Sequence, residues 1–209
     1  IFMDLPLVWN FENFTGGLPI QWSDEYGARL GVMPRKGSNE DVVWYDIDPC
    51  YVYHPLNAYE EGDNIVIDVC RMAHSMKAGV PDVPPVLHQW TINLTSGKVN
   101  EHQLDDRSVD FPRVPDSVVG LPYRYGYTAE FGNDGPTASA FRKYDMRTGS
   151  SVAHELNGRA GGEPVFVPIN ELRGKLLILS KNSFFDKPRT VSETVREVRE
   201  QGWVVNALD

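Results

Sequence analysis

The stretch Cys50–Arg71 holds the side chains of this sequence that are best suited to metal chemistry. The β-prone run Tyr51–Tyr53 predicts a short strand that delivers His54 at its end. Pro55 should stop regular pairing there, because proline has no backbone donor. A neutral imidazole in such a place can bind a transition metal, although many strand histidines are structural or lie at the surface. The residues by themselves leave both interpretations open.

A polar turn follows this histidine at residues 60–64, before a second apolar run, Ile65–Val69. This turn carries three carboxylates, Glu60, Glu61 and Asp63. They resemble the paired carboxylates of acid–base catalysis, but a solvated turn explains them better. We expect Asn57 and Tyr59 to hold the turn after His54 by side-chain hydrogen bonds.

The composition excludes several classes of function. Of 209 residues, 41% are hydrophobic, which is enough for a packed core. A formal charge of −9 argues against a nucleic-acid partner, because phosphate binding needs clustered Lys and Arg. No apolar run approaches the roughly 18 residues of a spanning helix, while peripheral contact of an apolar patch with a membrane stays open. The two cysteines, Cys50 and Cys70, predict neither a disulfide framework nor a zinc site, so a cytoplasmic location is the default.

Short apolar runs separated by turn signals, with 18 Gly and 15 Pro, predict an all-β fold. One internal repeat narrows this class, because Trp90–Val99 resembles Lys143–Val152 and Trp44–Ile47 is a weaker third copy. Repeats with a period near 40–50 residues are typical of β-propeller blades. Independent hairpins that share a turn type are the alternative.

The chain has room for about four propeller blades. It begins at Ile1, without an initiator Met, on residues that already form a strand pattern. We therefore expect it to be an internal or C-terminal fragment of a longer protein. Residues 1–168 should form the partial propeller, and residues 169–209 a divergent tail with a strand and then a helix. Within that tail, Thr190–Gln201 has a helical pattern with Ser192 as the expected N-cap.

Several ordered motifs resemble the carotenoid cleavage oxygenases, the family that includes lignostilbene dioxygenases and the retinoid isomerase of the retinal pigment epithelium. The motif His54–Glu60, His-Pro-Leu-Asn-Ala-Tyr-Glu, resembles the iron-ligand motif His-x-x-Asn-(Ala/Thr)-Tyr-Glu. The other matching segments occur in the order of the family and are Ile1–Leu7, Arg29–Arg35, Asp110–Arg113, Tyr123–Tyr127 and Glu163–Pro168.

The resemblance implies a seven-bladed propeller that carries Fe(II) on its axis, held by four histidines. Three of these ligands are supported by glutamates in the family. By residue-to-residue match, His54 is one iron ligand and Glu163 is one of the supporting glutamates. The remaining histidines, which match no ligand motif and should lie on the surface or in loops, are His74, His88, His102 and His154.

The same resemblance implies what this sequence lacks. Two ligand histidines should precede Ile1, and the last should follow in a Phe-His-Gly-type segment. One imidazole does not hold Fe(II) firmly, so we expect the chain alone to be inactive. After Pro168 the tail also departs from the family pattern.

The function implied by the resemblance is cleavage by dioxygen of a conjugated double bond in a carotenoid, apocarotenoid or stilbene, so the partners are an apolar substrate and O2. A non-catalytic propeller remnant or interaction module without iron is the alternative. The aromatic residues that could line a substrate tunnel, but for which core packing is the preferred interpretation, are Phe2, Trp9, Phe11, Trp22 and Tyr53.

Overall fold

The protein is described by a computed structural model in which most of the chain is placed. The residues described are 1–132, 137–159, 161–162, Pro164, Lys187, Thr190, Glu193, Thr194, Arg196 and Glu197. The chain divides into two compact units, residues 1–164 and 165–209. The predicted boundary after residue 168 lies outside the described residues and stays a prediction. Within the described part, no helix is both long and apolar enough to cross a membrane.

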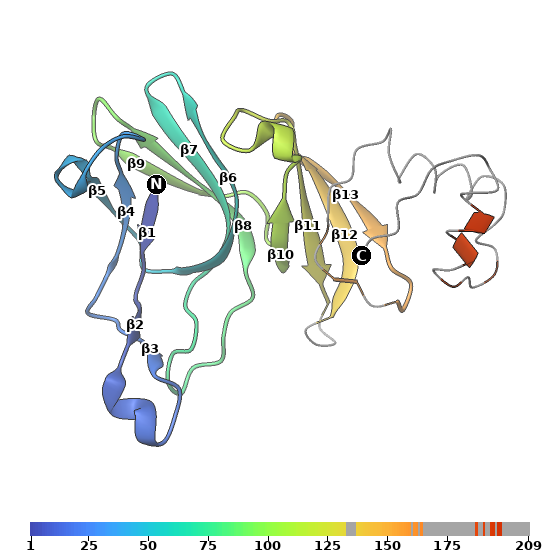
Figure 1. Cartoon of the computed structure of the whole chain (residues 1–209), viewed down its shortest axis with the longest axis horizontal. Coiled ribbons are helices and arrows are strands. Elements are labelled where there is room, and N and C mark those ends of the chain that lie inside the picture. Colours follow the sequence, from blue (N-terminus) through green and yellow to red (C-terminus); the bar gives the residue numbers. More distant parts are fainter. Residues whose placement is uncertain are drawn as a thin grey trace. The chain divides into compact units, whose positions relative to one another are not determined.

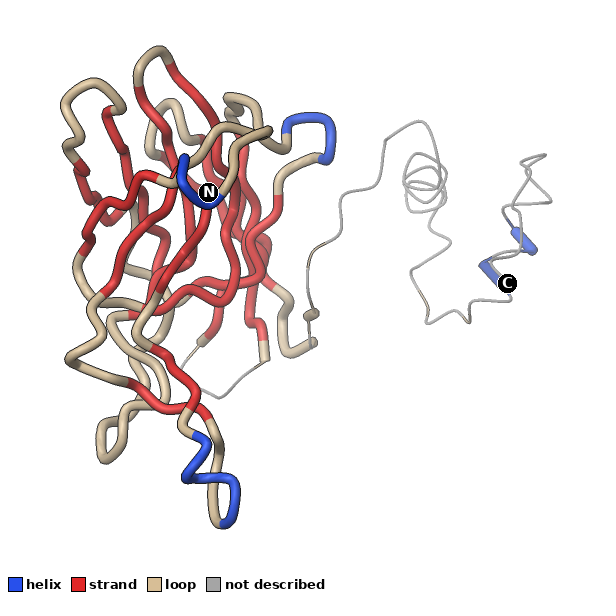
Figure 2. The backbone as a smooth tube through the Cα atoms, turned by 60° about the vertical axis from the view of Figure 1, so that its left-hand side comes forward, coloured by secondary structure: helices blue, strands red, loops and turns tan. Residues whose placement is uncertain are grey.

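The first unit is built from antiparallel strands, as the alternation of short apolar runs and turns predicts (Figure 1). Sheet A has the order β1-β4-β5, formed by Phe2–Asp4, Ala28–Val32 and Val43–Ile47. A separate hairpin pairs β2 (Leu7–Trp9) with β3 (Ile20–Trp22). The 3₁₀ turn η1 (Phe11–Thr15) forms the tip of this hairpin, as Figure 2 shows in blue.

Sheet C has four strands in the order of the chain, β6-β7-β8-β9. They are Tyr51–Glu61, Asn64–Met72, Val86–Asn93 and Val99–Gln103. The β6–β7 connection is a two-residue turn in which Gly62 has a φ of +58°. Glycine adopts this backbone region without the steric penalty of a side chain, and it favours the first central position of a type II′ hairpin turn.

Sheet D repeats the arrangement of sheet C, in the order β10-β11-β12-β13. Its strands are Val109–Arg113, Tyr125–Phe131, Ala138–Asp145 and Ser150–Glu155. Two further 3₁₀ turns, η2 (Asn39–Asp41) and η3 (Asp116–Val118), lie in loops before β5 and after β10.

The predicted internal repeat is the hairpin between the third and fourth strands of sheets C and D. Asn93 Oδ1 accepts the N–H of Ser96 at 2.8 Å, and Asp145 Oδ1 accepts the N–H of Arg147 at 3.1 Å. Each turn closes at a glycine of positive φ, Gly97 at +69° and Gly149 at +70°. The weaker third copy lies on β5, which continues into β6 rather than into a hairpin.

Two apolar layers hold the three large sheets together. One lies between sheets A and C and includes Leu30, Ile67 and Trp90, each fully buried. The other lies between sheets C and D, where Leu56 and Leu87 pack against Tyr144. Sheet C therefore lies between the other two (Figure 1). These inter-sheet layers stabilise the fold, since burial removes apolar surface from water.

The described residues of the second unit include helical positions, at Glu193, Thr194, Arg196 and Glu197. Thr190 Oγ1 accepts the N–H of Glu193 at 3.2 Å, and Glu193 Oε2 accepts the Thr190 N–H at 2.8 Å. This reciprocal pair is a capping box. These four positions lie within the predicted helical segment, and Thr190 forms the capping pair with Glu193. The expected N-cap, Ser192, lies outside the described residues. The predicted strand of the tail lies outside the described residues and stays a prediction.

Candidate functional site

His54 lies inside a long strand and not at the end of a short one. β6 runs from Tyr51 to Glu61 straight through Pro55, which corrects the expectation that proline stops the pairing. The register pairs Val52 with Arg71 and Pro55 with Val69, so Tyr53 and His54 together face one residue of β7. The missing backbone donor of Pro55 is tolerated because the β-bulge interrupts regular pairing at this point. In addition, β6 is an edge strand and pairs with a neighbouring strand of its sheet on one side only.

A carboxylate of the neighbouring sheet fixes the orientation of the His54 ring. His54 Nδ1 lies 3.0 Å from Asp110 Oδ1, across the boundary between β6 and β10. An ionised carboxylate can only accept, so Nδ1 carries the hydrogen, and in the neutral ring Nε2 keeps its lone pair. The His54 side chain is 43% exposed and that of Asp110 is 15% exposed. An imidazole held in this tautomer is a competent metal ligand at Nε2.

Asp110 is placed by a second bulge, in β10. The register pairs Asp110 with Ala129 and Arg113 with Tyr127, so Phe111 and Pro112 together face one residue of β11. Phe111 has a φ of +51°, a left-handed conformation that is uncommon for a bulky residue and often marks functional sites.

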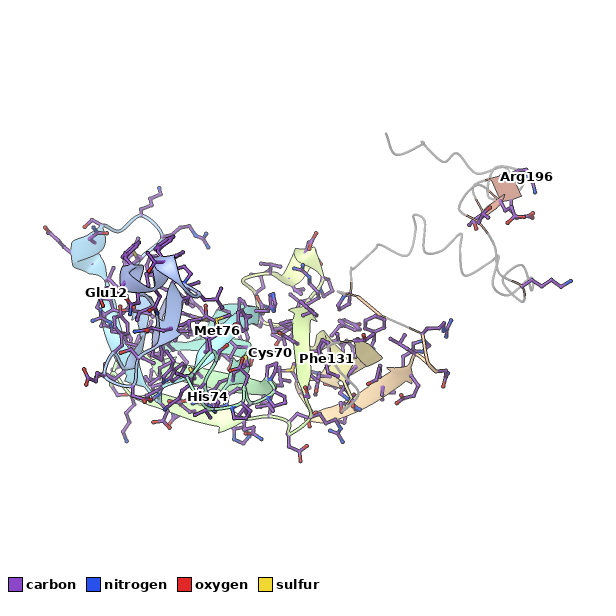
Figure 3. All side chains as sticks on the ribbon, turned by 90° about the horizontal axis from the view of Figure 1, so that it is seen from below. Glu12, Cys70, His74, Met76, Phe131 and Arg196 are labelled. Atoms are coloured by element: carbon purple, nitrogen blue, oxygen red, sulfur yellow. The ribbon has the colours of Figure 1, made fainter. Side chains whose placement is uncertain are left out.

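The same bulge turns aromatic rings toward the histidine. The ring of Phe111 lies 4.9 Å from that of His54 and 6.0 Å from that of Phe131, between centroids. Phe131 belongs to β11 in sheet D, and Figure 3 labels it together with Cys70 of sheet C. On the other side, the Tyr53 ring lies 6.3 Å from His54. The imidazole thus has aromatic neighbours from both sheets, and these exclude water from part of its surroundings.

Asn57 does not hold the turn that follows His54. Its side chain is 6% exposed and reaches the loop after β10 instead. Asn57 Nδ2 donates to the carbonyl oxygens of Val118 and Leu121, both at 3.1 Å, and Oδ1 accepts the N–H of Gly120 at 2.9 Å. The expected local hydrogen bonds are therefore replaced by contacts more than 60 residues away in the sequence.

A buried carboxylate lies behind the motif strand. Asp68 of β7 is fully buried and accepts hydrogen bonds from Gln89 Nε2 at 2.8 Å and Tyr123 Oη at 2.7 Å. Burial, only partly opposed by these two hydrogen bonds, raises the pKa of Asp68. Burial, with the nearby charge of Asp68, also raises the pKa of the motif residue Tyr59 to about 12. Tyr59 is thus a neutral phenol over the whole physiological range.

The two cysteines are free and buried, and they offer no thiolate to a metal. Burial raises the pKa of the Cys50 thiol to about 11. Burial, together with the negative charge of Asp110, raises the pKa of the Cys70 thiol well above its usual value. Because the thiolate is the ligand form, imidazole is the better donor at this site.

Four other expectations have mixed outcomes. Glu163 lies outside the described residues, so its role stays a prediction. The turn carboxylates Glu60, Glu61 and Asp63 are exposed, as expected. His102 and His154 are exposed, but His88 is buried in β8, its Nε2 3.4 Å from Glu101 Oε2, which corrects its assignment to the surface.

Core packing is the wrong interpretation for most of the named aromatic residues. Phe2, Trp9, Phe11 and Tyr53 are exposed by 47%, 61%, 71% and 43% respectively, and only Trp22 is partly buried. Trp9 and Phe11 stack at the β2–β3 hairpin tip, with ring centroids 6.1 Å apart.

The described residues bring one imidazole and its carboxylate together, and no third donor. Among them, no group of three or more His, Cys, Asp or Glu side chains could hold a metal ion. Asp110 is the residue of the candidate site that sequence reasoning missed. Its segment was noted as a family landmark, but the 56 residues that separate it from His54 gave no sign of contact.

Comparison with known proteins gives consistent matches over most of the chain. A model of the family described as retinal pigment epithelial membrane protein matches residues 1–195. A carotenoid cleavage oxygenase of Mycobacterium tuberculosis (strain ATCC 25618 / H37Rv) is 43% identical over 172 residues, which are 75% of this chain and 34% of the relative. A carotenoid 9,10(9',10')-cleavage dioxygenase of Crocus sativus is 28% identical over 192 residues, covering 80% and 35%.

A solved structure agrees in fold. The lignostilbene dioxygenase of Pseudomonas brassicacearum superposes with a TM-score of 0.72 at 25% identity, over 81% of this chain and 41% of its own. The predicted all-β partial propeller is confirmed by this likeness. The chain spans about a third of the length of the curated relatives it matches.

Proposed function

The chain belongs to the retinal pigment epithelial membrane protein family of carotenoid cleavage oxygenases, and from this premise we propose that it is part of a non-haem Fe(II)-dependent dioxygenase. The proposed reaction cleaves a conjugated double bond of a carotenoid, apocarotenoid or stilbene with dioxygen. The assignment of the site rests on one observation. His54 Nδ1 lies 3.0 Å from Asp110 Oδ1, and this contact leaves His54 Nε2 available to a metal.

His54 fits an iron site by its chemistry. Neutral imidazole suits Fe(II), and a carboxylate on the other ring nitrogen fixes the tautomer and raises the basicity of the ligand. Iron, when bound, would supply the open coordination positions at which dioxygen reacts. The chain's own contribution is to hold the imidazole: Asp110 accepts its hydrogen, and Phe111 packs against its ring.

A complete site needs donors beyond those of the described residues. We propose that three further histidines of the longer protein complete it, and that Glu163 supports one of them as Asp110 supports His54. On this basis the 209-residue chain is inactive alone. A Glu163→Gln variant of the extended protein should bind iron more weakly, by about 10- to 100-fold.

Iron content and product formation test the proposal. The chain and a version extended at both ends would be loaded with Fe(II) and assayed for iron and for cleavage of β-carotene or a stilbene. We expect stoichiometric iron and turnover in the extended protein only. Turnover by the 209-residue chain would refute its inactivity, and an extended protein without iron would refute the assignment of the site.

A second candidate function is an interaction module that keeps propeller blades without iron. It is favoured by the finding that the described part of the chain gathers no set of three metal-ligating side chains. The same assay separates the two candidates, because a module of this kind binds no iron even when it is extended.

We also propose that the protein is cytoplasmic and contacts a membrane surface, from which an apolar polyene could be taken up. The support is the exposed apolar tip of the β2–β3 hairpin, at Trp9, Phe11, Phe14 and Leu18. Such residues partition into the boundary between lipid headgroups and acyl chains.

A further inference from the structure

The proposed site depends on two strands that no backbone ladder joins. β6 is an edge strand of sheet C and β10 an edge strand of sheet D. Both strands contain bulges next to the site, and bulged residues are left out of regular pairing. The position of Asp110 relative to His54 must therefore be fixed by side chains that cross from one sheet to the other.

The side chain of Asn57 makes such a crossing three residues after His54. It makes two donated hydrogen bonds, to Val118 and Leu121, and one accepted bond, from Gly120. These use both N–H groups of the amide and an acceptor position of its oxygen. The loop that they hold follows β10 directly, so it continues the strand that carries Asp110.

The Asn57 amide suits this loop in its hydrogen-bonding groups as well as in its length. The two carbonyl oxygens need donors and the Gly120 N–H needs an acceptor, and a primary amide offers both kinds of group. A carboxylate of the same shape would face two carbonyl oxygens without a hydrogen to share. Asn57 is buried, so water does not readily replace the lost partners.

We propose that Asn57 is a positioning residue for the metal site: by holding the loop at residues 118–121, it sets β10 against β6 so that Asp110 reaches His54 Nδ1. This inference rests on the proposed function only in naming His54 a ligand. Asn57 touches neither the imidazole nor a metal, and it acts through the tautomer that His54 presents.

The test reads the His54 tautomer in the 209-residue chain without iron. The chain carries five histidines, so ring-¹⁵N-labelled histidine with a His54→Gln variant identifies the His54 signals in long-range ¹H–¹⁵N spectra. At a pH where the ring is neutral, we expect the Nδ1–H form to exceed the other by at least about tenfold in the unmodified chain, as one hydrogen bond to a carboxylate implies. In Asn57→Asp this excess should be lost, with the Nε2–H form becoming the major one.

Two further variants make the result specific. Tyr144→Phe removes a different hydrogen bond, from sheet D to Asp105 Oδ2 in the loop between β9 and β10 at 2.8 Å, and should keep the tautomer of the unmodified chain. Asp110→Ala should lose the Nδ1–H excess of His54 whether or not Asn57 positions the site. An unmodified chain in the Nε2–H form would overturn the His54–Asp110 pair itself, which separates that failure from a failure of Asn57.

The inference is overturned if Asn57→Asp keeps a dispersed, folded spectrum and the Nδ1–H excess of the unmodified chain. It is also overturned if Tyr144→Phe loses that excess to the same extent, since the effect would then be general loosening of the sheets. Should Asn57→Asp fail to fold, Asn57→Ser takes its place, because a shorter side chain cannot bridge all three partners. The same loss of the Nδ1–H form is expected in it, and its retention would count against the proposal.

Discussion

Asp68 accepts the hydroxyl hydrogen of Tyr123 at 2.7 Å, and this bond joins the second strand of sheet C to the segment that enters sheet D. Tyr123→Phe removes it and leaves the buried carboxylate with the hydrogen bond from Gln89 Nε2. A hydrogen bond to a charged group contributes about 1.5–3 kcal/mol, so we expect the free energy of unfolding to fall by about 2 kcal/mol. Urea unfolding followed by tryptophan fluorescence measures this difference.

Tyr127→Phe is the matched control for this prediction. Tyr127 lies on β11, and its hydroxyl makes no hydrogen bond among the described residues. Its removal should change the free energy of unfolding by less than about 0.5 kcal/mol. Equal losses in the two variants would show that the Asp68–Tyr123 bond does not stabilise the boundary between the sheets.

The same carboxylate should make stability depend on pH. Burial raises the pKa of Asp68 in the folded protein above its ordinary value, near 4 when unfolded. The folded state then binds the proton more tightly than the unfolded state. The contribution of Asp68 is fully present below the unfolded pKa and is lost as the pH rises through the folded pKa. The stability difference between the unmodified chain and Asp68→Asn should therefore fall from pH 4 upward, by at most about 1.4 kcal/mol per pH unit.

Asp105 provides a control of opposite sign. Burial would raise the pKa of Asp105, but hydrogen bonds from Tyr144 and Arg107 outweigh it and hold that pKa below its ordinary value. Its contribution is present above the unfolded pKa and is lost as the pH falls through the folded one. Denaturation of Asp105→Asn between pH 2 and 7 should show this reversed trend. A pH-independent difference for Asp68→Asn would contradict the assigned direction.

The strand pattern was predictable because it is local. The turns after Asn93 and Asp145 each need a side-chain acceptor and a glycine of positive φ, and the sequence displays both. β6 was not predictable in the same way. Pro55 removes one backbone donor, but the bulge at His54 and the edge position of the strand make that loss tolerable, and neither is visible in a short window of sequence.

The candidate site was likewise predictable only where its features are local in the sequence. His54 was singled out because its motif resembles a family pattern, whereas its partner Asp110 and the loop held by Asn57 lie more than 50 residues away. Side-chain contacts between sheets depend on how the sheets pack, and local propensity does not encode that packing. Exposure of Trp9 and Phe11 was missed because composition alone favours burial of aromatic residues.

The Asp110 carboxylate should set the iron affinity of the complete enzyme. Asp110→Asn replaces one acceptor oxygen with an amide nitrogen, and the remaining neutral oxygen accepts more weakly from His54 Nδ1. Loss of such a partner typically lowers metal affinity by about 10- to 100-fold. Competition with a chelator, in the protein extended at both ends, measures the change.

Two variants control for this prediction. His54→Gln should abolish iron binding, while Arg107→Gln, whose exposed guanidinium pairs with Asp105, should leave it unchanged. Unaltered affinity in Asp110→Asn would contradict the role of the carboxylate.

The tip of the β2–β3 hairpin should control attachment to vesicles. Phe11 and Phe14 are 71% and 61% exposed and stack with ring centroids 5.8 Å apart. Phe11→Ser with Phe14→Ser should lower partitioning onto phosphatidylcholine vesicles by at least about tenfold, since burying one aromatic side chain contributes about 1.5–3 kcal/mol. Because the formal charge is −9, anionic lipid should weaken the binding rather than strengthen it. Val152→Ser with Leu94→Ser removes exposed apolar groups elsewhere and should leave partitioning unchanged in a sedimentation assay. Equal losses in the two double variants, or no binding by the unmodified chain, would refute membrane contact through this tip.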